Sequence, residues 1–434
     1  MAGKQISTIS LLLFLFSLLQ FLPIYAQEKC GSTVRNQELS LQKPSLIPVR
    51  RAGEVEAALN EQKIKAGAIV LPSIVTIPVV VHVVYHAAVE NISDAQIQSQ
   101  MEALNRDYRK LNADTTAIPT CWKSLASDIG FEFCLATKDP NGNDTNGVTR
   151  TYTAATSFGI DDAVKDTAKA WDPTRYLNIW VCNLGNSYFG YSQFPYDLKS
   201  MPNTDGCVIN YFAFGQMGSA VSPSNLGRTT THEVGHWFNL IHTWGDAYCG
   251  NDSIADTPPQ TAAHFGCTAV FPDLSTACNP TTETNGTMYC NYMDYSDDPC
   301  LLLFTSDQKA RMLSALVTYR PVILAQNNCT PVFAGISPIA NGLSDSDLKV
   351  YPNPNNGRAT IGIGPAIQPI EITITNLIGQ VVQRLDVRNN TLSTNTVSQA
   401  TISLDLSKEP SGVYLVSVVT STGKLVKKLI KSDM

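Results

Sequence analysis

The upstream three quarters of the chain alternates between strand-like and helix-like spacing of apolar residues. A nearly continuous β-branched run at 77–86 predicts a central strand, because a strand buried on both faces has little polar alternation. Residues 93–104 begin with a capping residue and then place apolar positions three or four apart, which predicts a helix. Further strands are expected at 176–182 and 206–211, and a closing helix at 305–316. This order favours an α/β domain built on a mostly parallel sheet.

The pattern changes beyond residue 330. Residues 331–346 are rich in Gly, Ser, Pro and Asn and predict a linker. After them, polar and apolar residues alternate with the period of two that a half-buried strand requires. The alternating segments are 371–375, 401–406, 413–418 and 424–430. A small all-β sandwich is therefore expected over 347–434.

The segment 232–242 reads HEVGHWFNLIH and places three histidines and one glutamate close together. His232 and His236, four residues apart on a helix, lie about 40° apart around its axis and face the same side. His242 reaches the same point only if the backbone turns sharply, and Asn239 stands where that turn should fall. Asparagine is the commonest non-glycine residue in the left-handed conformation that such a turn needs. The spacing therefore predicts a metal site and a backbone reversal together.

Three neutral imidazoles suit a zinc ion and leave its fourth position open, which is typical of catalytic zinc. Glu233, beside the first ligand, is placed to hydrogen-bond a water on the metal and to act as general base. Two alternatives stay open: histidines of an ordinary helix, and a downstream glutamate as third ligand in place of His242. His82 and His86, about 13 Å apart in the predicted strand, are too distant for one ion and are interpreted as core or edge residues.

The motif resembles the extended zinc signature of the metzincin metallopeptidases, with asparagine in place of the common glycine, a variant familiar in the pappalysin branch. A second match, NYMDYSDD at 291–298, is similar to the pappalysin Met-turn. The resemblance implies an α/β metzincin-like zinc peptidase domain over 52–330, with a twisted mixed sheet and an active-site helix. It also implies that Met293 forms a hydrophobic floor beneath the metal and that Tyr295 hydrogen-bonds the developing oxyanion.

Eleven cysteines, an odd number, indicate disulfides and one residue left over. Pappalysins carry two interleaved bridges between the zinc helix and the Met-turn, which implies Cys249 to Cys278 and Cys267 to Cys290 in this chain. The residues alone leave that connectivity open, and a cysteine zinc site is the rival interpretation.

The loop after Cys249 resembles the pappalysin segment that binds calcium, because carboxylates and carbonyls are the ligands that calcium takes. The resemblance makes Asp252, Asp256 and Thr257 candidate calcium ligands. A solvated turn is the alternative interpretation.

Cys30 is the candidate for the unpaired cysteine, because Cys30-Gly31 resembles a segment near the start of pappalysin propeptides. In those proteins a thiolate occupies the open zinc position and keeps the zymogen inactive. Residues 27–51 are accordingly interpreted as a propeptide, with an activation site near Arg50-Arg51. A disulfide or a free surface thiol is the alternative for Cys30.

Residues 1–26 resemble a secretory signal peptide, with Lys4, an apolar stretch and a small residue at Ala26. A membrane anchor is the alternative, but the stretch is short for a span. Downstream, Tyr-Pro-Asn-Pro at 351–354 and the lysine-rich last strand resemble the sorting domain of type IX secretion. A carbohydrate- or protein-binding module is the less favoured alternative. The resemblance implies export through the periplasm, the secretion machinery as a partner, and no stable membrane span.

The composition agrees with a secreted enzyme. Charged residues make up only 16% of the chain and the net charge is −6, which gives no electrostatic reason to expect nucleic acid as a partner. We expect a secreted zinc endopeptidase that hydrolyses extracellular proteins or peptides through a zinc-bound water activated by Glu233. The alternative is an inactive metzincin-like adhesin, against which the intact glutamate argues. Asp297 and Asp298 indicate an acidic pocket after the scissile bond that would favour Lys or Arg.

Overall fold

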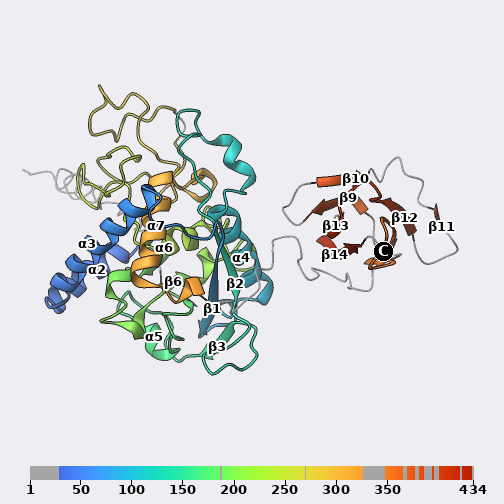
Figure 1. Cartoon of the computed structure of the whole chain (residues 1–434). Helices are drawn as coiled ribbons and strands as arrows, with labels where there is room; N and C mark the ends of the chain where they lie inside the picture. Colours follow the sequence, from blue (N-terminus) through green and yellow to red (C-terminus); the bar gives the residue numbers. More distant parts are fainter. Residues whose placement is uncertain are drawn as a thin grey trace, which may run out of the picture.

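The structure is a computed structural model that describes residues 29–185, 188–268, 270–325, 348–364, 369–376, 381–385, 393–394, 400–420 and 423–432. The predicted signal peptide and the predicted linker lie outside the described residues. Figure 1 shows an α/β part upstream and an all-β part from residue 348 onward.

A six-stranded sheet organises the α/β part, and β1 runs through it as the predicted central strand. The strands are β1 (Val75–Tyr85), β2 (Phe131–Leu135), β3 (Val148–Tyr152), β4 (Leu177–Cys182), β5 (Gly190–Ser192) and β6 (Cys207–Asn210). Their order is β2-β1-β4-β6-β5, and β3 pairs the second half of β1 while β2 pairs the first half. All neighbours are parallel except β5, which lies antiparallel at the edge. The sheet is therefore mixed, as expected.

Helices cover both faces of this sheet. They are α4 (Asp94–Tyr108), α5 (Ala163–Thr167), α6 (Arg228–Trp237) and α7 (Ser306–Tyr319). Short 3-10 turns lie between the larger elements: η2 (Ala88–Glu90), η3 (Ala113–Ala117), η4 (Pro195–Asp197), η5 (Pro202–Thr204), η6 (Tyr211–Ala213), η7 (Asp298–Cys300) and η8 (Ile323–Ala325). Alternate residues of β1, including Val79 and Val81, share one core with α4, α6 and α7. This main core holds the active-site helix against the sheet.

The second face of the sheet explains the two strand histidines. His82 is buried there, stacked on Trp180, and its ring nitrogens lie 2.8 Å from Thr149 Oγ1 and 3.0 Å from Asn178 Oδ1. His86 is exposed at the end of β1. Their interpretation as core and edge residues is confirmed.

Two further helices, α2 (Ser32–Gln42) and α3 (Leu46–Lys65), precede the sheet, and α3 packs along α7. The predicted activation site at Arg50-Arg51 lies inside α3. Arg50 is buried and donates two hydrogen bonds of 2.7 Å to the carboxylate of Asp197. Proteolysis favours exposed loops, so α3 must open locally before this bond becomes accessible.

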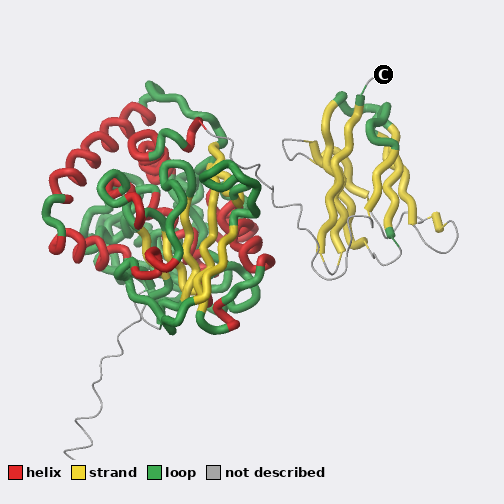
Figure 2. The backbone as a smooth tube through the Cα atoms, turned by 90° about the horizontal axis from the view of Figure 1, so that it is seen from below, coloured by secondary structure: helices red, strands yellow, loops and turns green. Residues whose placement is uncertain are grey.

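Two antiparallel four-stranded sheets form the all-β part, as the two layers of Figure 2 show. One has the order β10-β9-β13-β14 and the other β11-β12-β8-β7. The strands are β7 (Leu348–Tyr351), β8 (Arg358–Ile363), β9 (Pro369–Asn376), β10 (Val381–Leu385), β11 (Ser393–Thr394), β12 (Ala400–Asp405), β13 (Gly412–Thr420) and β14 (Gly423–Lys431). Ile361, Ile374, Leu404 and Val416 contribute to the apolar core between them. Across the described residues, no helix is both long and apolar enough to cross a membrane.

Candidate metal centre and active site

Helix α6 and the turn that follows it bring three histidines to one point. The helix ends at Trp237, and Asn239 reverses the chain with φ of 73°, in the left-handed region. The Nε2 atom of His236 lies 3.1 Å from that of His232 and 3.2 Å from that of His242, and the last two atoms lie 3.2 Å apart. The predicted reversal and the predicted convergence of the three rings are both present.

The other ring nitrogens are already occupied. The Nδ1 atom of His232 lies 2.8 Å from the carbonyl oxygen of Tyr292, and that of His236 lies 2.7 Å from the carbonyl oxygen of Leu240. Because a carbonyl only accepts, each Nδ1 carries the proton and each Nε2 presents a lone pair to the centre. Burial, with the nearby rings, lowers the pKa of His232 to about 3 and that of His236 well below its usual value, so both rings are neutral.

His242 is held by a carboxylate. Its Nδ1 atom lies 2.5 Å from Oδ1 of Asp246, and its ring stacks on Trp244 with the ring centroids 4.3 Å apart. Three inward lone pairs repel one another unless a cation lies between them. Tetrahedral zinc with bonds of about 2.0–2.1 Å places neighbouring nitrogens roughly 3.3 Å apart, close to the observed separations. The donor set therefore fits zinc.

Cys30 supplies a fourth donor. Its sulfur lies 3.4 Å from Nε2 of His236, and the ligand atoms of Cys30 and the three histidines all lie within 4.8 Å of one another. The neighbouring Gly31 donates its N–H to the carbonyl of Gly190 on β5, which attaches this segment to the sheet edge. Burial, reinforced by the Glu233 carboxylate, raises the pKa of the Cys30 thiol well above its usual value. A dication in the centre would oppose both effects.

Glu233 lies beside this centre and is fully buried. Ser32 Oγ donates a hydrogen bond of 2.9 Å to its Oε2 atom, whereas its Oε1 atom is buried and accepts no hydrogen bond from the described residues. Burial raises the pKa of Glu233 to about 8, which suits a group that takes up a proton and returns it near neutral pH. Gly190 makes room for it, since a Cβ there would meet Glu233 Cγ at 2.9 Å.

The Met-turn lies against the histidines, as the resemblance implies. Met293 is fully buried, and a Cβ on Gly235 would meet its sulfur at 2.5 Å, so the helix and the turn approach closely only because residue 235 is glycine. The Tyr295 ring lies 4.9 Å from that of His242, and its hydroxyl donates a hydrogen bond of 3.2 Å to the carbonyl oxygen of Cys30.

The two acidic residues after the Met-turn differ in their partners. Asp297 accepts a hydrogen bond of 2.7 Å from the ammonium of Lys29, which also reaches the carbonyl oxygen of Ser296 at 3.3 Å. Asp298 accepts hydrogen bonds from the backbone N–H of Leu226 and of Arg228, and burial raises its pKa to about 6. Asp298 is among the residues that line the small cavity beside the metal centre, as is Lys29, and Asp297 adjoins that cavity through its ion pair with Lys29.

One of the two predicted disulfides is correct and the other is wrong. Cys249 is bonded to Cys278 as expected, but Cys267 is bonded to Cys300 and not to Cys290. Cys290 is a buried free cysteine in an apolar cluster with Trp122 and other residues. The N–H of residue 297 donates to the carbonyl of residue 266, and this contact brings Cys267 beside Cys300. The rival interpretation of the cysteines as a zinc site has no support among these partners.

The candidate calcium loop forms internal contacts. Thr257 Oγ1 donates 2.6 Å to Asp252 Oδ2, while both carboxylate oxygens of Asp256 accept from the start of α7, at Thr305 and Asp307. The carboxylates of Asp252 and Asp256 thus accept hydrogen bonds from different groups. Among the described residues, His, Cys, Asp and Glu side chains gather as a possible metal site only at Cys30 and the three histidines.

A triad of histidines with an adjacent buried glutamate, set on a mixed sheet above a buried methionine, defines a metallopeptidase of the metzincin type. Comparison with known proteins narrows the class. The family described as “Pregnancy-associated plasma protein-A” matches residues 159–317, and the one described as “Secretion system C-terminal sorting domain” matches residues 349–432. An extracellular metalloprotease of Pyricularia oryzae is 31% identical over 318 residues, which span 71% of this chain and 96% of that protein.

Two solved structures from Tannerella forsythia are also similar. A promirolysin mutant is 41% identical with a TM-score of 0.61, and the match covers 68% of this chain and 97% of that one. Mature mirolysin in complex with a cleaved peptide is 47% identical with a TM-score of 0.55, covering 58% and 97%. The chain belongs to the pappalysin family of metallopeptidases. It is a secreted zinc metalloendopeptidase with a type IX sorting domain, rather than an inactive adhesin.

Several residues of the site were not predicted from the sequence. Asp246 and Trp244 hold His242, and Gly190 makes room for Glu233. An acidic residue four positions after a candidate metal-binding histidine is a usable signal, because ligating imidazoles commonly donate to a carboxylate. Nothing in the local sequence distinguishes Gly190 from other glycines.

Replacing Asp246 with alanine should weaken zinc binding by about 10- to 100-fold, because His242 loses the acceptor that fixes its ring. The measurement is zinc retention against increasing chelator in the full chain. Asp166→Ala, at an exposed aspartate paired with Lys169 on the surface, is the matched control. Equal zinc retention by both variants would contradict the prediction.

Proposed function

We propose that His232, His236 and His242 bind the catalytic zinc and that Glu233 is the general base of peptide hydrolysis. The observation that carries this proposal is the triangle of unprotonated Nε2 atoms with the free Oε1 atom of Glu233 beside it. Zinc in that position supplies a Lewis acid that polarises the scissile carbonyl and acidifies water.

The protein groups then handle the protons and the developing charge. Glu233 takes a proton from the attacking water and returns it to the leaving amine, which its raised pKa favours. Tyr295 donates its hydroxyl to the oxyanion that forms on the scissile carbonyl. The hydroxyl now donates to the carbonyl oxygen of Cys30, and the Tyr295 ring lies 4.9 Å from the His242 ring, which together support this role.

Cys30 is proposed to keep the enzyme latent as the fourth ligand. The segment that carries it also bonds both working side chains, because Ser32 donates to Glu233 and the Cys30 carbonyl accepts from Tyr295. Release of the propeptide, proposed as residues 27–51, would free all three positions at once. The similarity to a promirolysin supports a latent form.

The Lys29–Asp297 ion pair supports a preference for Lys or Arg after the scissile bond. Lys29 directly precedes Cys30 and places its ammonium 2.7 Å from the Asp297 carboxylate. Both side chains are about one fifth exposed, at 19% and 24%, so solvent screens the pair only in part. A basic substrate side chain would replace Lys29 there.

Calcium binding by Asp252, Asp256 and Thr257 stays a prediction. It is supported by the buried carboxylate of Asp252, whose pKa burial raises to about 6 and which therefore would gain from a cation. The type IX secretion machinery is the proposed partner of residues 347–434, and extracellular proteins or peptides are the proposed substrates.

Glu233→Gln should lower kcat by on the order of 10²–10⁴ while bound zinc stays at one equivalent, because the amide keeps the shape but takes up no proton. The measurement is hydrolysis of casein by the activated enzyme, with metal analysis of the same sample.

His242→Ala is the companion variant and should lose zinc. Full zinc retention in that variant would favour a downstream glutamate as the third ligand. Unchanged, chelator-sensitive hydrolysis by Glu233→Gln would exclude the glutamate as general base.

Cys30→Ala should make the uncleaved full chain hydrolyse peptides, because the fourth metal position becomes open. Replacing the zinc with cobalt shows whether the Cys30 sulfur binds the metal. A sulfur-to-metal absorption band is expected in the wild-type chain and should be absent in the variant. Cys182→Ala, at a buried free cysteine of β4, is the control. Latency through the Cys30 sulfur would be contradicted if the uncleaved Cys30→Ala chain hydrolysed no peptide and its cobalt spectrum were unchanged.

Asp297→Asn should lower kcat/KM about tenfold for peptides with Lys or Arg after the scissile bond and leave peptides with Leu there unchanged. A cleavage-site profile of the activated enzyme on a peptide library gives both values. No basic preference in the wild-type profile would exclude the acidic pocket.

A further inference from the structure

The working residues after α6 lie in a long segment without regular structure. In the described residues between α6 and η7, which omit only position 269, there is no helix or strand. This segment carries His242, Met293 and Tyr295. Long irregular loops are usually mobile, so something other than backbone ladders must fix these three side chains.

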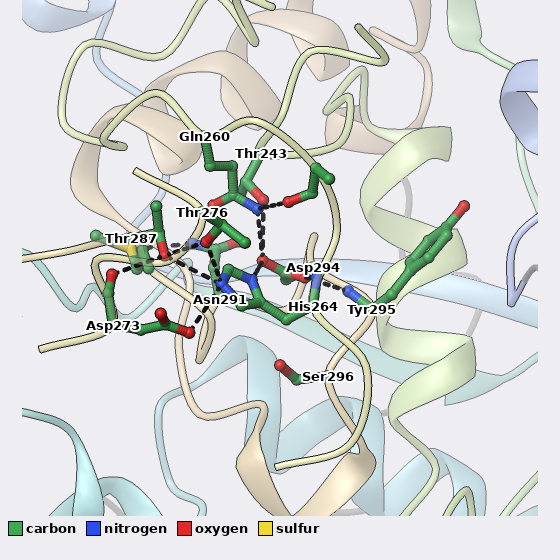
Figure 3. A network of polar contacts seen from close by, with 12 residues as sticks. Thr243, Gln260, His264, Asp273, Thr276, Thr287, Asn291, Asp294, Tyr295 and Ser296 are labelled. Carbon is green, nitrogen blue, oxygen red and sulfur yellow. Dashed lines mark hydrogen bonds and ion pairs between the residues drawn. The ribbon is translucent and has the colours of Figure 1, made fainter. Parts of the chain in front are cut away.

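Asp294, between the methionine and the tyrosine of the Met-turn, is the centre of a buried polar network that Figure 3 shows. Its carboxylate accepts hydrogen bonds from the backbone N–H of Tyr295 at 2.6 Å and of His264 at 2.8 Å. It also accepts from the Gln260 amide at 2.8 Å and from Thr243 Oγ1 at 3.4 Å. One carboxylate therefore joins the Met-turn to the residue after His242 and to the loop at 260–264.

His264 is the imidazole partner of Asp294 within this network. Its Nδ1 atom lies 2.7 Å from Asp294 Oδ2, and its Nε2 atom lies 2.7 Å from Thr276 Oγ1 and 3.0 Å from Thr287 Oγ1. Asp273 approaches the same Nε2 atom at 3.4 Å. Burial lowers the pKa of His264, but the hydrogen bond and the charge of Asp294 outweigh it and raise the pKa above its usual value. Both ring nitrogens are thus occupied and the ring is fixed.

The segment around His264 is attached to the Met-turn at two further points. The carbonyl of Gly266 accepts a backbone hydrogen bond of 2.9 Å from Asp297, and Cys267 is bonded to Cys300. Three attachments within four residues hold this segment along one side of the Met-turn. The attachment through Asp294 ends on the backbone N–H of Tyr295, and the ring of Phe265 also lies against the Tyr295 ring, with the centroids 5.9 Å apart.

We propose that His264 and Asp294 are positioning residues that fix the backbone at Tyr295 and so hold its hydroxyl ready for the oxyanion. The inference rests on the proposed role of Tyr295. A misplacement of about 1 Å costs on the order of 100-fold in rate, so a buried hydrogen bond between His264 and Asp294, one residue from the hydroxyl donor, affects kcat more than substrate binding. Neither side chain touches substrate in this proposal.

A double-mutant cycle on the activated enzyme tests the proposal with a quenched-fluorescent peptide. His264→Phe should lower kcat roughly tenfold with KM changed less than twofold. In a Tyr295→Phe background the same change should lower kcat less than twofold, because the group that it positions is already gone. His264→Gln, whose amide still donates to Asp294, should recover most of the rate.

Two controls separate positioning from loss of structure. His82→Phe, at a buried histidine on the far face of the sheet, should lower the Tm without coupling to Tyr295→Phe. Thr276→Val, which removes one hydroxyl from Nε2, is the milder variant if His264→Phe fails to fold, and it should show the same coupling at a smaller size. Bound zinc is measured in every variant and should stay at one equivalent.

Equal losses of kcat from His264→Phe in both backgrounds, or no loss in either, would overturn the proposal. An unchanged kcat in Tyr295→Phe alone would remove the proposed role of the tyrosine, and the positioning role with it. The zinc and Glu233 assignments would stand in that case, because they depend on metal retention and on the Glu233→Gln rate.

Discussion

The arrangement depends on three imidazoles whose Nε2 atoms face one another in a buried space. Nitrogens 3.1–3.2 Å apart with no proton between them are unfavourable unless a cation is present, so the site is built for a metal before any substrate arrives. Two carbonyls and the Asp246 carboxylate fix the tautomers. The left-handed turn at Asn239 and the close contact at Gly235 serve the same convergence.

Different parts of the structure hold different residues of the metal site. The sheet and α6 hold His232, His236 and Glu233 by ordinary core packing, since α6 shares the apolar core of β1. The Met-turn joins the same core through Tyr292 and Met293, but the irregular segment that carries it and His242 is also held by disulfides and buried polar contacts. Loss of a single buried acceptor is costly in such a network, because its donors are left without partners.

The residues that could be predicted are those whose signal is local. The apolar run of β1, the capped helix α4 and the spacing of the three histidines are set by neighbours a few positions away. The partner of Cys267 could not be predicted, because it follows from a backbone contact between residues 266 and 297. Strand β8 was missed, since its interior glycine weakens the alternation. The network around Asp294 joins positions from 243 to 294, a separation at which sequence spacing carries no information.

The contacts of residues 29–32 bear on how latency ends. Lys29 holds Asp297, the Cys30 sulfur lies at the metal centre, and Ser32 holds Glu233, all within one short stretch. While the stretch is tethered to the chain, each contact raises the local concentration of the others, so none opens alone for long. Proteolytic cleavage downstream of residues 29–32 breaks none of these contacts, but it separates the stretch from the rest of the chain as a free peptide. Dilution in the medium then favours dissociation of this peptide from the enzyme, whereas crowding at a cell surface would slow the dissociation.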